Sequence, residues 1–250
     1  MSKENRIEVL GVGFDNLDMR EAVDAALTLI DEHSAAYIVT PNPEIVMLSR
    51  KDESLASSLK DASLVIADGV GIVYGARILG TPLKARLPGI DFAGSLMQEL
   101  SKKNGRVYLF GSKPGVAEMA AKTLSDAHPG LLICGTQNGY FSDDTKIIED
   151  INAAKPDLLL VCLGAPKQEL WMQMNASGLD VGLMIGLGGS LDVFAGVLQR
   201  APDRWCKLGL EWLYRLIKEP RRIVRMSKLP VFLFAVIWRR IFVGRNKREN

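Results

Sequence analysis

The sequence predicts an α/β fold, with a doubly wound parallel sheet in residues 1–196 and a helical appendage in residues 197–250. Two observations predict it. Through Gly196, apolar β-rich runs alternate with amphipathic stretches, which is typical of parallel strands joined by right-handed crossover helices. After Gly196 the strand-like runs cease, and tryptophans and arginines accumulate instead.

The expected strands are short runs that are mostly apolar at every position. Continuous apolar runs indicate strands covered by helices on both faces. They lie at Ile7–Val12, Ala36–Thr40, Leu64–Ala67, Val107–Phe110, Leu131–Cys134, Leu158–Cys162 and Val181–Ile185. The stretches between them predict helices at Met19–His33, Val70–Leu79, Phe92–Lys103, Pro114–Ala127 and Asp144–Ala154.

The composition is that of a folded cytoplasmic protein. A chain of 250 residues with 48% apolar and 24% charged residues can bury one large core. No signal-peptide core follows the N-terminus, so export is not expected. The three cysteines form no CxxC pair, which suits a reducing compartment. Only two histidines are present, which leaves little material for a histidine-based metal site or triad.

Charge divides the chain into two parts. Residues 200–250 hold 14 Lys/Arg and 4 Asp/Glu, a net charge of +10, whereas residues 1–199 carry a net charge of −8. A basic tail on an acidic body predicts an anionic partner. In Leu229–Val243, aromatic and aliphatic residues interleave with arginines, a pattern typical of a segment lying on an anionic membrane surface rather than on nucleic acid. Its apolar run of eight residues is too short to span a bilayer, which needs about 20. We therefore expect peripheral association with the inner face of the cell membrane.

Cations in the tail share one helical face. At roughly 100° per residue, Arg215, Lys218, Arg222 and Arg225 would align in a continuous helix, although Pro220 is expected to kink or split it. The stripe is either a solvated face or a site for diphosphate.

Polar residues follow two of the expected strands, where open α/β sheets bind their ligands. Thr40 and Asn42 could hydrogen-bond a sugar, or they could form only a turn and a helix cap. Asp68 follows a buried strand and could act as a general base on an acceptor hydroxyl, or it could cap the next helix.

Glycine turns follow three later strands, at Gly111–Gly115, Gly164–Glu169 and Gly186–Asp192. Backbone N–H groups at such helix starts favour phosphate or nucleotide, although neither GxGxxG nor a P-loop is present. Asp192 could accept a hydrogen bond from a ribose or a uracil. No D-x-D triplet occurs, so we expect arginines such as Arg86, rather than a metal ion, to neutralise a leaving diphosphate.

Taken in order, these motifs resemble the WecG/TagA/CpsF glycosyltransferase family over nearly the whole chain. The matching segments are Thr40–Glu44, Ala67–Gly71, Pro88–Asp91, Gly164–Glu169, Gly188–Gly196, Arg200–Pro202, Leu210–Arg215 and Glu219–Arg222. The resemblance implies a Rossmann-like domain with a C-terminal helical appendage. It also implies an inverting, metal-independent glycosyltransferase that needs no cofactor.

The resemblance also implies roles for individual residues. Asp68 would be the catalytic base for the acceptor 4-hydroxyl. The substrate-binding residues would be Thr40, Asn42, Arg86 and Gln168 in the pocket, Asp192 at the uridine, and Arg215, Arg222 and Arg225 at the diphosphate of the donor or the lipid.

In the TagA branch of the family, the donor is UDP-N-acetylmannosamine (UDP-ManNAc) and the acceptor is GlcNAc on undecaprenyl diphosphate. The β-1,4-linked product begins the linkage unit of wall teichoic acid. Three alternatives stay open: another donor, such as UDP-ManNAc uronic acid or a UDP-hexose; a soluble nucleotide-dependent enzyme, such as a dehydrogenase or methyltransferase; and a nucleotide-binding membrane adaptor. The oligomeric state is also open, since apolar residues of the tail could form a homo-oligomer interface.

Overall fold

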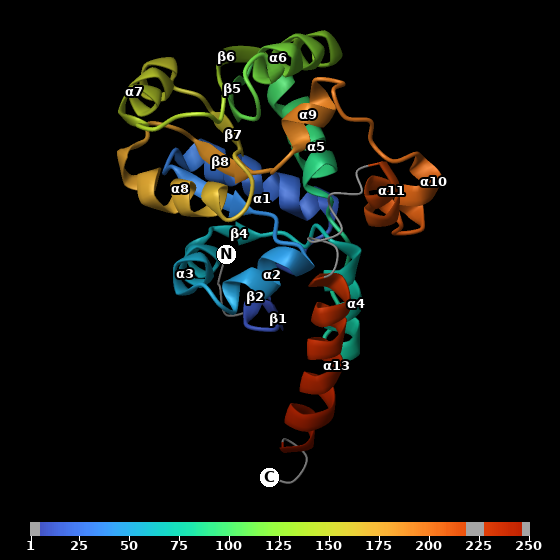
Figure 1. The fold of residues 1–250 in the computed structure, drawn as a ribbon. Coiled ribbons are helices and arrows are strands. Elements are labelled where there is room, and N and C mark those ends of the chain that lie inside the picture. Colours follow the sequence, from blue (N-terminus) through green and yellow to red (C-terminus); the bar gives the residue numbers. More distant parts are fainter. Residues whose placement is uncertain (1–5, 219–227, 247–250) are drawn as a thin grey trace.

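The computed structural model describes residues 6–218 and 228–246 (Figure 1). Its centre is a six-stranded sheet in the order β4-β3-β8-β7-β5-β6, in which every neighbouring pair is parallel. The predicted doubly wound parallel sheet is therefore confirmed. The strands are β3 (Ala36–Val39), β4 (Leu64–Val65), β5 (Arg106–Gly111), β6 (Leu132–Gln137), β7 (Leu158–Cys162) and β8 (Leu183–Gly186).

Helices cover both faces of the sheet. Along β3, Ile38 joins one apolar cluster while Tyr37 and Val39 join the other, as the alternation of side chains across a strand requires. The first cluster is covered by α1 (Met19–Glu32), α5 (Gly89–Ser101), α6 (Val116–Ala127) and α9 (Ser190–Phe194). The second is covered by α2 (Pro43–Ser49), α3 (Glu53–Asp61), α4 (Val70–Leu79), α7 (Thr145–Ala154) and α8 (Lys167–Asn175), which the 3-10 turn η2 (Ala176–Gly178) follows.

The prediction that Ile7–Val12 forms one strand of the parallel sheet is wrong. Residues 7–12 do not form one strand of the parallel sheet but belong to a separate antiparallel hairpin of β1 (Ile7–Val9) and β2 (Val12–Phe14). Leu10 and Gly11 turn the chain with φ values of 53° and 96°, the left-handed pair that suits a two-residue hairpin. Asp15 fastens the hairpin to the sheet, because its Oδ2 accepts a hydrogen bond from the Val65 N–H at 2.8 Å.

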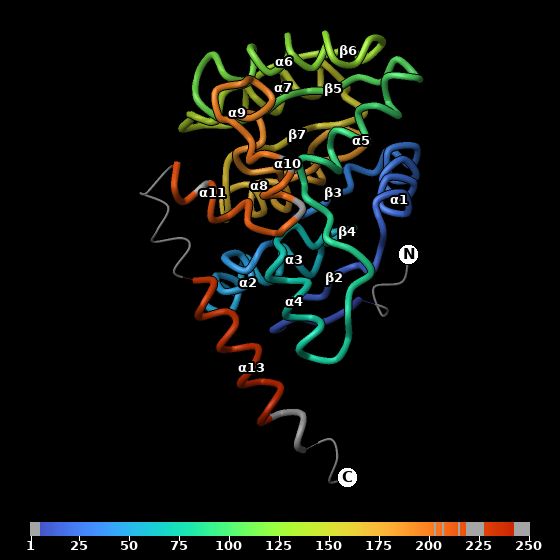
Figure 2. Tube along the Cα trace, turned by 90° about the vertical axis from the view of Figure 1, so that its right-hand side faces the viewer, coloured from blue at the N-terminus to red at the C-terminus, as the bar shows by residue number. Residues whose placement is uncertain are grey.

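The C-terminal segment is helical where it is described, with α10 (Asp203–Lys207), α11 (Glu211–Lys218) and α13 (Lys228–Asn246). α13 runs along α4 and contacts α2 (Figures 1 and 2). Gly75 of α4 permits the close approach, since a Cβ there would lie 3.0 Å from Cζ of Phe232. Phe232 and Val236 are fully buried in the same cluster as Val9 of β1. α13 therefore completes the core on this face of the sheet, and the domain boundary at residue 196 stays a prediction.

The opposite face of α13 is apolar and exposed. Side chains on it are 46–66% exposed, namely Val231, Phe234, Ile237, Trp238, Ile241 and Phe242. The rings of Phe234, Trp238 and Phe242 follow one another along the helix, with centroids 6.1 Å and 4.1 Å apart. Over residues 6–218 and 228–246, no helix is long and apolar enough to cross a membrane.

Two phenylalanines of α13 test this assignment of faces. Phe232→Ala should lower the free energy of unfolding by about 3–5 kcal/mol, because it leaves a cavity between α13 and α4. Phe234→Ala should change it by less than about 1 kcal/mol, because that ring is 66% exposed. Urea unfolding followed by circular dichroism measures both. Equal losses from the two variants would contradict the packing of α13.

Candidate active site

A cleft of about 340 Å³ opens at the carboxyl ends of four adjacent strands, β4, β3, β8 and β7. Parallel strands end at one edge of their sheet, so residues distant in sequence meet there. Five of the predicted site residues line this cleft: Thr40, Asn42, Asp68, Arg86 and Gln168. The C-terminal segment closes one side with Glu211 and Trp212 of α11 and Leu229 of α13.

Asp68 lies half-buried where the chain leaves β4. Its Oδ1 accepts a hydrogen bond at 3.0 Å from the N–H of Gly89, the first residue of α5. The following helix, α4, has Gly69 at its N-cap and no side-chain cap, so the alternative that Asp68 caps that helix is wrong. The carboxylate is thus fixed on the wall of the cleft by a helix that begins about twenty residues later in the chain.

Arg86 joins the wall of the cleft to the C-terminal segment. Its Nε donates to the backbone oxygen of Asp68 at 2.9 Å, and its Nη2 donates to Oε2 of Glu211 at 2.8 Å. The two side chains of this ion pair are only 21% and 10% exposed. The guanidinium therefore holds α11 against the loop that carries Asp68. Glu211 is not conspicuous in the sequence, because an acidic residue is common in the first turn of a helix.

Thr40 and Asn42 also take part in the structure of the cleft. The Oγ1 of Thr40 donates to the backbone oxygen of Gly186 at 2.8 Å, which links the ends of β3 and β8. The Oδ1 of Asn42 accepts from the N–H of Ile45 at 3.1 Å and caps α2, so the helix-cap interpretation is correct for this oxygen. A cap uses one end of an amide only, and Nδ2 of Asn42 has no acceptor in the part of the chain that the structure describes.

Gln168 forms part of the floor of the cleft and is 2% exposed. Its Oε1 accepts from the N–H of Gly188 at 2.9 Å, and its Nε2 donates to Oε1 of Glu169 at 2.9 Å. Glu169 is fully buried, and this burial raises the pKa of its carboxyl above the ordinary value. In the sequence, Glu169 is noticeable only as the last residue of the segment Gly164–Glu169.

The other predicted residues lie apart from this group or are not described. Asp192 does not line the cleft; its Oδ1 accepts from Oγ of Ser112 at 3.0 Å, which joins the first turn of α9 to the loop after β5. Arg215 belongs to α11, but its side chain is not described, and Arg222 and Arg225 fall outside the described residues. Their roles stay predictions.

Acidic, histidine and cysteine side chains do not gather into a metal-binding group anywhere in the described structure; no set of three or more could hold an ion.

Comparison with known proteins gives a consistent result. Residues 7–246 match the model of the glycosyl transferase WecG/TagA/CpsF family. Relatives from Staphylococcus aureus strains MW2 and NCTC 8325 / PS 47 are each 33% identical over 238 residues, which cover 94% of this chain and 93% of the relative. Both relatives are named N-acetylglucosaminyldiphosphoundecaprenol N-acetyl-beta-D-mannosaminyltransferase.

The Arg86–Glu211 pair should be coupled in stability measurements. Arg86→Gln and Glu211→Gln should each lower the free energy of unfolding by about 1–3 kcal/mol, because each removes one charge of an ion pair that is largely shielded from solvent. The double variant should lose less than the sum of the two. Lys84→Gln breaks an exposed pair with Glu21 and should change stability little. Additive losses would show that the two side chains do not act together.

Proposed function

The chain belongs to the WecG/TagA/CpsF family of glycosyltransferases, and we propose that it transfers N-acetylmannosamine from UDP-ManNAc to the 4-hydroxyl of GlcNAc-diphospho-undecaprenol. The names of the relatives, which give this sugar and this acceptor, support the choice of substrates. The observation that carries the mechanism is the carboxylate of Asp68, held on the wall of a cleft that other polar groups line.

In the proposed reaction, Asp68 takes the proton of the acceptor 4-hydroxyl. The oxygen of that hydroxyl attacks the anomeric carbon of the donor sugar at the same time. The bond from that carbon to the β-phosphate breaks, and UDP leaves with the bonding electrons. One displacement of this kind inverts the anomeric centre, so an α-linked donor gives a β-linked product. The neighbouring Thr40, Asn42, Arg86 and Gln168 would hold the sugars in place.

The charge that develops on UDP needs positive groups, and the C-terminal segment is rich in them. Two contacts fasten that segment beside the cleft. Glu211 of α11 forms an ion pair with Arg86. At the start of α13, Nζ of Lys228 lies 3.9 Å from Oε1 of Glu44. We propose that Arg215, Arg222 and Arg225 meet the diphosphate of the donor or of the lipid, with no metal ion.

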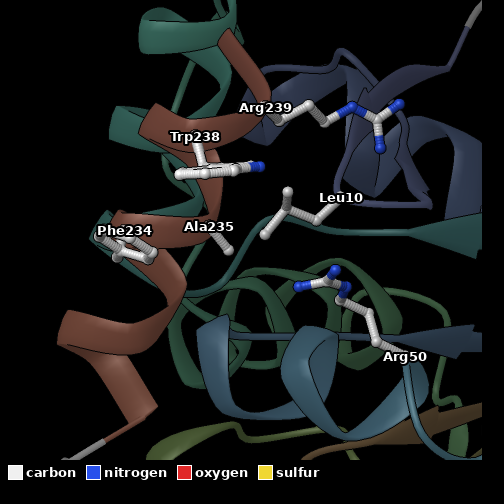
Figure 3. Close-up of a pocket in the computed structure, with 6 residues that line it drawn as sticks. All are labelled: Leu10, Arg50, Phe234, Ala235, Trp238 and Arg239. Carbon is white, nitrogen blue, oxygen red and sulfur yellow. The ribbon is translucent and has the colours of Figure 1, made fainter. Parts of the chain in front are cut away.

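The exposed face of α13 is the proposed contact with the membrane. Beside it is an apolar recess of about 540 Å³, bordered by Ala235 and Trp238 of α13 and by Leu10 of the hairpin (Figure 3). Arg50 and Arg239 lie at its rim. Apolar side chains flanked by arginines suit the interface of an anionic leaflet, where the lipid-linked acceptor resides.

The substrate proposal is tested by offering UDP-ManNAc, UDP-GlcNAc, UDP-glucose and the uronic acid of UDP-ManNAc in turn with a GlcNAc-diphospho-lipid. Each reaction is run with and without a chelator. We expect transfer from UDP-ManNAc, a β-linked product and no effect of the chelator. Preference for another donor would change the proposed donor sugar but not the proposed mechanism. Loss of activity with the chelator would contradict the proposal that no metal ion takes part.

Asp68→Asn should lower kcat by about 10²–10⁴-fold, because the amide cannot accept the proton. The amide oxygen can still accept from the Gly89 N–H, so the fold and the affinity for UDP should be retained. Steady-state kinetics and calorimetric titration with UDP measure the two effects. Asp126→Asn on the outer side of α6 is the matched control. A rate within about threefold of the wild type would exclude Asp68 as the base.

Phe234→Ser with Trp238→Ser should weaken sedimentation with anionic vesicles by at least about tenfold, since two exposed apolar side chains are removed. Transfer to a short-chain, water-soluble acceptor should persist. Met119→Ser with Tyr140→Ser, which changes two exposed apolar residues of the α/β body, should leave vesicle binding unchanged. If Phe234→Ser with Trp238→Ser binds vesicles as well as the wild type, the membrane contact lies elsewhere. If this variant instead shows altered self-association without lipid, the exposed face of α13 is an interface of a homo-oligomer.

A further inference from the structure

Glu169 is a buried acid that the proposed reaction does not use. It is the third residue of α8, follows Gln168, which lines the cleft, and is fully buried. Among the side chains that the structure describes, its Oε2 has no hydrogen-bond partner, and no Lys or Arg forms an ion pair with it. Burying such a group is costly, and a leucine would fill a similar space without that cost. The acid therefore needs an explanation other than packing.

Among the described residues, the side chain of Glu169 forms a hydrogen bond with that of Gln168. Its Oε1 lies 2.9 Å from Nε2 of Gln168, whose own Oε1 accepts from the Gly188 N–H at 2.9 Å. The two ends of a glutamine amide are almost identical in shape, so only their partners decide which end points where. Here both ends have a partner, one on α8 and one on the turn after β8.

Gln168 lies closely on the end of β8. A Cβ at Gly186 would be 3.0 Å from Nε2 of Gln168 and 2.8 Å from Cε of Met172, so the amide has little space in which to turn. Two hydrogen-bonding positions remain for the cleft, the second hydrogen on Nε2 and the second lone pair on Oε1. Which of them faces a given part of the cleft depends on the orientation of the amide.

We propose that Glu169 is a positioning residue for the transfer reaction: it holds the amide of Gln168 in the one orientation that both binds the Gly188 turn and presents a fixed donor and acceptor to the substrates. This inference rests on the proposed function for what occupies the cleft. Glu169 does not line the cleft and touches no substrate; it acts through Gln168.

Electrostatics agree with this role. Burial raises the pKa of Glu169, which favours the neutral acid. A neutral carboxyl retains a carbonyl oxygen that accepts from Nε2 of Gln168, and it avoids placing a charge at a position that is fully buried. The acid is therefore suited to orient an amide rather than to bind a cation.

A double-mutant cycle tests the coupling in kcat/KM. Glu169→Leu and Gln168→Ala should each lower it by about 10- to 100-fold. Adding Glu169→Leu to Gln168→Ala should lower it by no more than about twofold further, because the residue through which Glu169 acts is already absent. Glu169→Gln keeps an acceptor oxygen at the same place and should restore at least about a third of the wild-type value. Glu169→Ala replaces the leucine variant in the cycle if the latter does not fold.

A second measurement does not depend on turnover. The side-chain NH₂ signals of Gln168, assigned by their loss in Gln168→Ala, should exchange slowly with solvent in the wild type and in Glu169→Gln. In Glu169→Leu they should exchange at least about tenfold faster, because the amide loses its acceptor. Val23→Ala, a core change in α1 on the other face of the sheet, is the control for loss of stability. It should change neither the exchange rate of the Gln168 NH₂ signals nor kcat/KM.

Multiplicative losses in the cycle, or unchanged exchange in Glu169→Leu, would overturn the inference and leave Glu169 a packing residue. If the wild type transfers no sugar from any donor, the proposed function fails instead, and the exchange measurement still decides whether Glu169 orients Gln168.

Discussion

The parallel pairing of β4, β3, β8 and β7 is the constraint on which the rest of this structure depends. Each of these strands ends at the same edge, and each is followed by a polar or glycine-rich turn. Hydrogen bonds then join the ends to one another, from Thr40 to Gly186 and from Gly188 to Gln168. Groups assigned to substrate binding therefore also hold the floor of the cleft together, so that recognition and local stability are difficult to separate by mutation.

A second level of organisation comes from the C-terminal segment. Arg86 connects the backbone of Asp68 with Glu211, so the loop that carries the proposed base and the helix that closes the cleft share one guanidinium. On α13, Leu229 lines the cleft, Phe232 is buried in the core and Phe234 is exposed. A helix with these three environments links the cleft to the surface proposed to contact lipid without any additional domain.

The sheet could be predicted because short runs that are apolar throughout alternate with amphipathic stretches, which is the pattern of parallel strands covered by helices on both faces. The hairpin could not, since Leu10-Gly11 lacks the Asn-Gly or Asp-Gly pair that usually indicates such a turn. α13 is apolar on more than one side, so its sequence indicated an interfacial helix but did not distinguish the buried Phe232 from the exposed Phe234. Glu169 was not identified because burial, rather than local pattern, makes it unusual.

The packing around Gly75 also has a consequence for how this protein is made. A Cβ at this position would touch Val9 of the first strand and Phe232 of the last helix, which are separated by more than 200 residues. During synthesis the hairpin and α4 leave the ribosome with this apolar surface uncovered, and it stays uncovered until α13 emerges. Co-translational folding can therefore complete one face of the sheet once α9 has emerged, but the other is completed only after α13 has followed, and until then it is the surface that a chaperone would recognise.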